Sequence, residues 1–212
     1  MSLYTDLLPE VMPFATDCPQ NVAVNAIRNA AIEFCERSLY YTYEVPAVDT
    51  VSGTAKYSLV LPADTTLAHI TDAWVDKRFL NHVGEDDLRQ LYGNDWRTQN
   101  GFPAYVTQQD LSNVILVPNP ITSVVGGLKL IAALKPTRAS TTIDSGIKER
   151  WLEVIAAGAL ARVHAIPNMS FSDPQTAMLN RAIFSAGIAR ADVERRRGLV
   201  RTITSVRPPR FV

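Results

Sequence analysis

The 212-residue sequence predicts an α+β protein: a helical bundle built from N- and C-terminal helices, an inserted antiparallel β-rich domain and an extended C-terminal arm. Helical periodicity marks the early and late parts of the chain, and alternating aromatic and β-branched segments fill the middle. An arginine-rich segment with two prolines ends the sequence. The expected boundaries are 1–38 and 137–199 for the bundle, 39–136 for the insertion and 200–212 for the arm.

The first helix is expected directly after Pro19. A proline is tolerated at a helix start, because the N–H that it lacks would have no intrahelical partner there. Apolar residues then recur at steps of three and four residues as far as Ser38. The main stripe consists of Ala23, Ile27, Ala30 and Phe34. Cys35 lies at the edge of this stripe, where a small buried thiol is expected rather than a reactive one.

From Leu39 the pattern changes to strands separated by turn-forming clusters. The expected strand segments are LYYTYEV, YSLVLP, HITDAWVDKRFL, AYVTQQ, NVILVP and GLKLIAALKP. A short helix is expected at 85–92, because three acidic residues suit the positive end of a helix dipole and Gly93 can close it. These elements predict a compact β unit.

Helical periodicity returns over 145–164, and Pro167 ends that helix. A second helix is expected to begin at the Asp173–Pro174 pair and to run to about Arg197, before Gly198. On this helix one face is formed by Leu179, Ile183, Ala186 and Val193, with Phe184 and Ile188 beside them. The early helix can bury its stripe only against these two late helices, so the bundle must form across the insertion.

The charge balance excludes some classes of protein and hides a local asymmetry. The sequence contains 21 basic and 21 acidic residues, so a uniformly basic nucleic-acid coat or membrane-surface protein is not expected. Residues 181–212, however, carry eight arginines and two acids, a net charge of +6, which leaves −6 on residues 1–180. The N-terminal segment is acidic where a signal peptide would be basic, so export by a signal peptide is not expected. The sequence has no long apolar stretch, so no membrane partner is expected.

Sequence motifs for chemistry are missing. There is no glycine-rich phosphate loop and no nucleophile elbow, and His69, His82 and His164 are scattered without metal-ligand spacing. Two cysteines without a CxxC pair suit a reducing compartment. We therefore expect no catalytic residue, no cofactor and no metal, and no enzyme.

The sequence does offer candidate contact residues. The arm combines arginines with apolar residues and a stiff proline pair, a pattern suited to an extended segment that binds another chain. Its predicted contacts are Arg201, Arg207, Pro208, Pro209, Arg210 and Phe211. Further candidates for subunit or partner contacts are Arg190, Arg195, Arg196 and Arg197. Trp96 and Arg97 lie in a polar loop that either contacts a tail partner or buries the tryptophan for its own packing.

The opening LLPEVMPFATDCPQNVAVNAIRNAAIEFCERS, the segment GLKLIAALKPTR, the linker HAIPNMSFSDPQTA and the ending GIARADVERRRG…VRPPRF resemble the head-to-tail adaptor (connector) proteins of tailed bacteriophages. The resemblance spans nearly the whole chain. It implies a structural virion protein that forms a homo-oligomeric ring, a dodecamer in such proteins, below the portal protein. The ring joins the capsid to a downstream tail or nozzle protein and extends the DNA channel.

The resemblance further implies that the arm grips the portal, that the bundle forms the ring body and that the β region faces the next tail component. DNA would pass through the channel without specific binding, and the ring would be assembled in the cytoplasm of the bacterial host. The residues leave one alternative open, a DNA-binding protein that uses the C-terminal arginine cluster. Binding by such a cluster would fall steeply with added salt.

Overall fold

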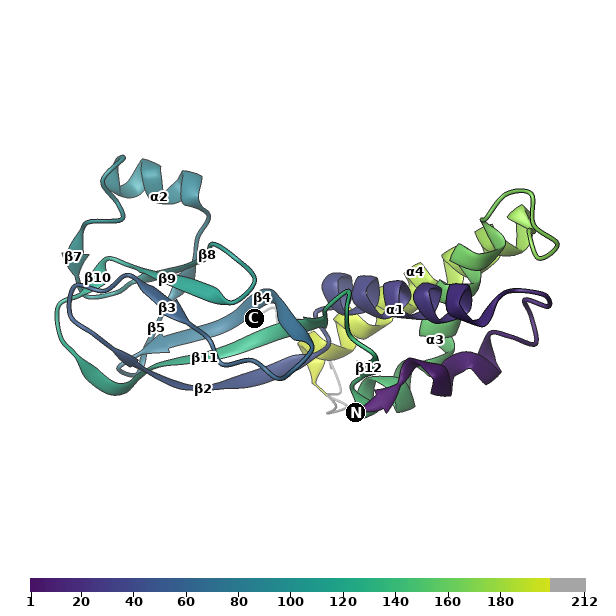
Figure 1. The fold of residues 1–212 in the computed structure, drawn as a ribbon. Helices are drawn as coiled ribbons and strands as arrows, with labels where there is room; N and C mark the ends of the chain where they lie inside the picture. Colours follow the sequence, from purple (N-terminus) through teal and green to yellow (C-terminus); the bar gives the residue numbers. More distant parts are fainter. Residues whose placement is uncertain (199–212) are drawn as a thin grey trace, which may run out of the picture.

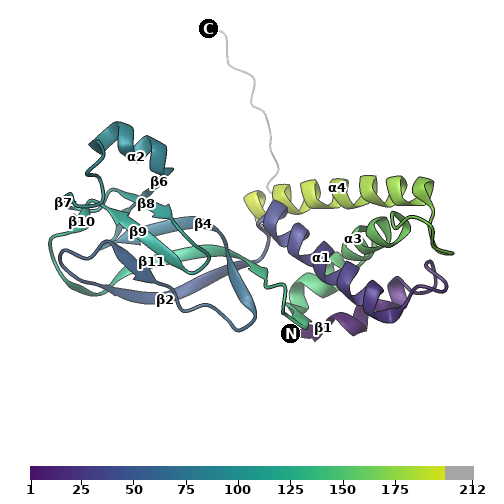
Figure 2. The same cartoon turned by 45° about the horizontal axis from the view of Figure 1, so that its top comes forward.

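The computed structural model describes residues 1–198; the predicted arm lies outside the described residues. The predicted α+β class is confirmed. Figures 1 and 2 show an elongated molecule with a helical unit beside a β unit. The helical unit consists of β1 (Ser2–Leu3), η1 (Tyr4–Glu10), α1 (Gln20–Ser38), β12 (Thr142–Ile143), α3 (Ser145–His164) and α4 (Pro174–Arg197).

The β unit contains six strands of three or more residues, four strands of two residues and one short helix. They are β2 (Thr42–Thr50), β3 (Lys56–Ser58), β4 (Thr65–Val75), β5 (Arg78–Phe79), β6 (Asn81–His82), α2 (Glu85–Tyr92), β7 (Asn100–Gly101), β8 (Tyr105–Gln108), β9 (Asn113–Val117), β10 (Asn119–Pro120) and β11 (Val124–Pro136). The predicted bounds of the four α-helices agree with the structure. The predicted strand HITDAWVDKRFL is divided by a turn at Asp76 and Lys77, so that its end forms β5 and pairs back on β4. The other two-residue strands were not predicted.

Two four-stranded sheets form the β unit, in the strand orders β2-β11-β4-β5 and β3-β9-β8-β6. Most pairs are antiparallel as predicted, but β6 pairs with β8 and β7 with β10 in parallel. A hydrophobic core that includes Leu67, Leu116 and Leu130 lies in this unit. A smaller cluster under α2 contains Leu88 and Trp96.

The three long helices of the helical unit pack on one another around a core that is separate from that of the β unit. Phe34 of α1, Ile155 of α3 and Phe184 of α4 are all fully buried there. A Cβ atom at Gly158 would lie 2.7 Å from the ring of Phe184, so the absence of a side chain lets α3 and α4 approach closely. At Gly187 of α4 a Cβ would overlap the side chain of Val154 of α3, so this glycine also permits the close approach of the two helices.

The helix starts follow the sequence signals. Asp144 accepts hydrogen bonds from the backbone N–H groups of Gly146 and Ile147, and Asp173 caps α4 in the same way. The segment before α1 was not predicted to be regular, yet η1 forms there and packs against α1 and α3. Its Tyr4 and Leu7 are buried in the helical core.

The predicted face of α4 needs a correction. Phe184 and Ile188 point into the core, but Leu179 is 63% exposed, Ile183 48% and Val193 46%. The helix therefore carries apolar residues on two opposite sides. Only the side that includes Phe184 and Ile188 packs against α1 and α3.

Candidate assembly surfaces of the helical unit

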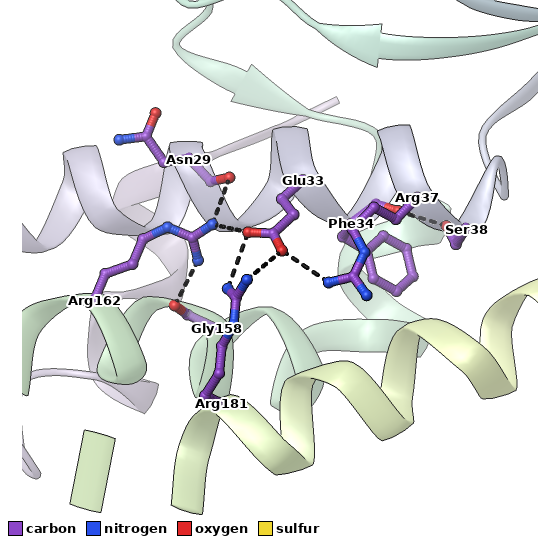
Figure 3. A network of polar contacts seen from close by, with 8 residues as sticks. All are labelled: Asn29, Glu33, Phe34, Arg37, Ser38, Gly158, Arg162 and Arg181. Carbon is purple, nitrogen blue, oxygen red and sulfur yellow. Dashed lines mark hydrogen bonds and ion pairs between the residues drawn. The ribbon is translucent and has the colours of Figure 1, made fainter. Parts of the chain in front are cut away.

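A network around one carboxylate joins the three long helices (Figure 3). Glu33 of α1 accepts hydrogen bonds from Arg37 in its own helix and from Arg162 of α3. It accepts two more from Arg181 of α4, at 2.8 and 3.0 Å. Arg162 also donates to the backbone oxygens of Gly158 and Asn29. Charge-assisted bonds of this kind are about twice as strong as neutral ones, so the network fixes the relative positions of the helices.

The ionisation of this network follows from its burial. Burial alone would raise the pKa of Glu33, but hydrogen bonds from Arg181 and Arg37 and the charge of Arg162 outweigh it, so the pKa lies below its usual value. Burial lowers the pKa of Arg162, although Glu33 opposes that effect. The carboxylate therefore stays ionised at neutral pH. The network is structural, because every one of its charged groups is engaged by its neighbours.

A second polar cluster lies at the C-terminal end of α4. Glu194 accepts a hydrogen bond from the Tyr40 hydroxyl at 3.0 Å and pairs with Arg150 of α3 at 2.7 Å. Arg190 lies over the ring of Trp151, 5.7 Å from its centroid. These contacts connect the end of α4 to the segment that follows α1 and to α3, at the position where α3 departs from helical geometry, at Trp151.

The arginines that were predicted as contact residues differ in their surroundings. Arg195 and Arg196 both pair with Asp192, at 3.2 and 2.8 Å, and hydrogen bonds from them help to hold the pKa of Asp192 low against the effect of burial. Arg197 is exposed at the last residue of the helix. The predicted contacts Arg201, Arg207, Pro208, Pro209, Arg210 and Phe211 lie outside the described residues.

The side of α4 that faces away from α1 and α3 is an exposed apolar surface, here called the outer face. It is formed by Met178, Leu179, Ala182, Ile183, Ala186, Ala189 and Val193. Arg190 is the one charged residue on this side between Met178 and Val193. The sequence pattern contained this surface, but the periodicity could not say which of the two apolar sides of the helix was buried.

Trp96 and Arg97 take different roles in the structure. Trp96 is 2% exposed and packs with Leu88, so the tryptophan buries its own loop instead of presenting an aromatic surface. Arg97 remains on the surface, where it lies 4.7 Å from the Trp96 ring centroid and pairs with Glu85 at 3.1 Å. Of these two residues, Arg97 is the one that is accessible to a partner.

The cysteines and histidines are the candidate reactive groups among the described residues. Burial, with a smaller effect of Asp144, raises the pKa of Cys35 to about 12, so this thiol is unreactive, and Cys18 is also buried. His69 and His82, distant in the sequence, lie with ring centroids 6.0 Å apart. No group of three or more His, Cys, Asp or Glu side chains in residues 1–198 could hold a metal ion. Over the same residues, no helix has the length and apolar character needed to cross a membrane.

An exposed apolar helix face bordered by arginines is typical of a subunit within a larger assembly. The particular assembly follows from the family. The chain belongs to the SU10 adaptor protein family, whose model matches residues 2–208, and this is a family of phage head-to-tail adaptors. No curated protein matches the chain. The family predicted from the sequence resemblance is therefore confirmed.

Proposed function

We propose that this adaptor forms a homo-oligomeric ring below the portal protein, joins the capsid to the tail and extends the DNA channel. The observation that carries the proposal is the family match over residues 2–208, nearly the full chain. The protein would be a virion component at the head–tail interface, assembled in the host cytoplasm, with no catalytic activity. A dodecamer is the ring size that the family resemblance implies.

The proposed division of labour follows the two units. The helical unit, with residues 1–38 and 137–199, would form the ring body, since its elements carry the outer face of α4. The β unit, residues 39–136, would face the downstream tail or nozzle protein. Exposed apolar side chains around β7, β10 and the start of β11 support this role, since such residues commonly serve partner contacts. They are Val51, Phe102, Ile121 and Val125.

Residues 200–212 would bind the portal, with Arg201, Arg207, Arg210 and Phe211 as contacts. Arginine forms paired hydrogen bonds with carboxylates, so an acidic surface of the portal is the expected partner. DNA would pass through the ring without specific binding. The local charge distribution supports this, because residues 1–180 carry a net charge of −6 and would not neutralise many phosphates.

Mass photometry of the purified protein with its candidate portal tests the proposal. We expect a defined complex for the full chain and loss of that complex after deletion of residues 200–212. Circular dichroism of the deletion variant should match the full chain, because the helical core involves residues up to Ala191.

A matched variant with Arg201, Arg207 and Arg210 changed to lysine keeps the charge but removes the planar guanidinium groups. We expect this variant to bind the portal more weakly than the full chain and more tightly than the deletion. Unchanged portal affinity after the deletion would contradict the role of the arm. A protein that ignores the portal and shifts only with DNA, in a salt-sensitive way, would instead be the DNA-binding alternative.

A further inference from the structure

The outer face of α4 lacks a partner within the described part of the chain. A helix that is apolar on opposite sides is normally buried on both of them. Here Phe184 and Ile188 fill the inner side, while Leu179, Ile183 and Met178, the last 75% exposed, remain accessible on the outer side. The exposed strip covers 15 residue steps from Met178 to Val193, which corresponds to roughly 22 Å of helix.

The shape of the outer face restricts what can pack there. Ala182, Ala186 and Ala189 occupy its middle, and larger side chains lie towards both ends. Small residues in the middle of a helix face allow a partner element to approach its backbone closely. The face therefore suits a short, compact element of a protein partner.

The charges near the outer face identify the chemistry of that partner. Helix α4 carries five arginines and two acidic residues, and Arg190, Arg196 and Arg197 border the apolar strip. An element that covers the strip should therefore be acidic and partly apolar.

The N-terminal segment of the same protein, residues 1–19, has this composition. It contains Asp6, Glu10 and Asp17 and not one basic side chain. All three acids are exposed, and so is Leu3, at 51%. Only Asp6 takes part in an ion pair among the described residues, with Lys148 at 3.2 Å.

The two surfaces lie on opposite sides of the helical unit. Segment η1 packs against α1 and α3, and α4 packs against the same two helices. In Figure 2, α4 lies along one side of α1 and α3, and the segment with β1 and η1 lies along the other. Within one chain, only the end of the N-terminal segment comes near α4, where Phe14 lines a pocket with Thr176 and Asn180. The parts that lie on the other side, β1 and η1, can therefore cover the outer face of α4 only in a neighbouring chain.

From these observations we infer that the outer face of α4 docks on the N-terminal segment, residues 1–19, of a second copy of this chain. One contact between copies then covers both exposed surfaces. Repetition of such a head-to-tail contact closes into a ring when the rotation between copies allows it. The inference rests on the proposed ring and adds the two surfaces that form it.

Photo-crosslinking between distinguishable copies tests this contact. The photoreactive p-benzoylphenylalanine is placed at Met178, at the edge of the outer face, in unlabelled full-length protein. This protein is mixed with ¹⁵N-labelled wild-type chain, alone and on the candidate portal, and crosslinked peptides are identified by mass spectrometry. We expect crosslinks to residues 1–19 of the labelled copy. The same probe at Val125 in β11, which is 90% exposed, serves as the control and should give no crosslink to residues 1–19.

A charge in the middle of the outer face should weaken the contact without unfolding the protein, since Ala186 is exposed. We expect Ala186→Glu to reduce self-association at least tenfold in sedimentation velocity, or to reduce the copies bound per portal ring in mass photometry. Ala47→Glu, the same change at an exposed position of β2, is the matched control and should leave both readouts unchanged.

Crosslinks between copies that fall only outside residues 1–19, or no crosslink between copies under either condition, would overturn the inference. The portal complex is scored separately. Crosslinks from Met178 to residues 1–19 without any portal binding would support the contact and refute the adaptor proposal. A portal complex with Ala186→Glu at full copy number would refute the contact and leave the adaptor proposal intact.

Discussion

The helical unit and the β unit differ in how the chain builds their cores. The β unit folds from one continuous stretch, and its core residues, such as Leu67 and Leu116, come from neighbouring strands. The helical unit combines α1 with α3 and α4, which follow only after the whole β unit. The units meet mainly where α1 contacts β11. One core is thus built from a single continuous stretch of chain, whereas the other forms only when segments far apart in the sequence meet.

The largest expected effect separates the two cores. Phe34→Ala should destabilise the helical unit by about 3–5 kcal/mol, because the ring is fully buried against Trp151, with centroids 5.5 Å apart. Hydrogen exchange followed by mass spectrometry should show lost protection in α1, α3 and α4 with β8 and β9 still protected. Leu116→Ala is the reciprocal variant and should affect the β unit. Equal loss of protection in both units would mean that they unfold as one.

A smaller effect concerns the network that holds the helical unit together. Glu33→Gln should cost about 2–3 kcal/mol at neutral pH, since it leaves Arg162 and Arg181 without their carboxylate. Urea unfolding measures this loss. Glu36→Gln is the matched control on α1, because Glu36 forms an exposed pair with Lys135, and it should cost no more than about 1 kcal/mol.

The same variant predicts a pH dependence. The pKa of Glu33 is lower in the folded than in the unfolded protein, so its stabilising effect is complete above the unfolded pKa of about 4.3. That contribution disappears as the pH falls through the lower, folded pKa. Wild type should therefore lose more stability than Glu33→Gln on acidification below about pH 4.3. Parallel stability curves for the two proteins would contradict this assignment.

The smallest effect belongs to the β unit. Arg97→Ala should change stability by less than about 1 kcal/mol, since its pair with Glu85 is at the surface. If the loop contributes to tail docking, the same change should weaken binding of the downstream tail protein in a pull-down. Arg89→Ala, which removes another partner of Glu85 on α2, is the control and should leave that binding unchanged. A large loss of stability for Arg97→Ala would show that the residue supports the packing of Trp96.

The contrast between the units also explains how much the sequence could predict. Helix bounds followed from capping and periodicity, and Asp173 and Gly198 marked the ends of α4 as expected. The orientation of α4 did not follow, because apolar residues occur all around it and a periodic pattern identifies a side only when the other side is polar. Leu179 and Phe184 look equally buried in the sequence.

Long-range polar contacts were also beyond the sequence. Glu33 has Arg37 four residues away, a familiar helix pair, but nothing indicates that Arg162 and Arg181 reach the same carboxylate. The burial of Trp96 was one of two alternatives that composition could not separate. Segment η1 was missed because Pro9 interrupts the periodicity, and its burial depends on α1 and α3.

The discontinuous core of the helical unit has a consequence during protein synthesis. Helix α1 leaves the ribosome with its apolar stripe uncovered, and its partner Phe184 is added about 150 residues later. At bacterial translation rates this interval lasts roughly 10–30 s. In that time the β unit can fold, while α1 remains available to chaperones. Its stripe stays open to aggregation until the last helices of the nascent chain arrive.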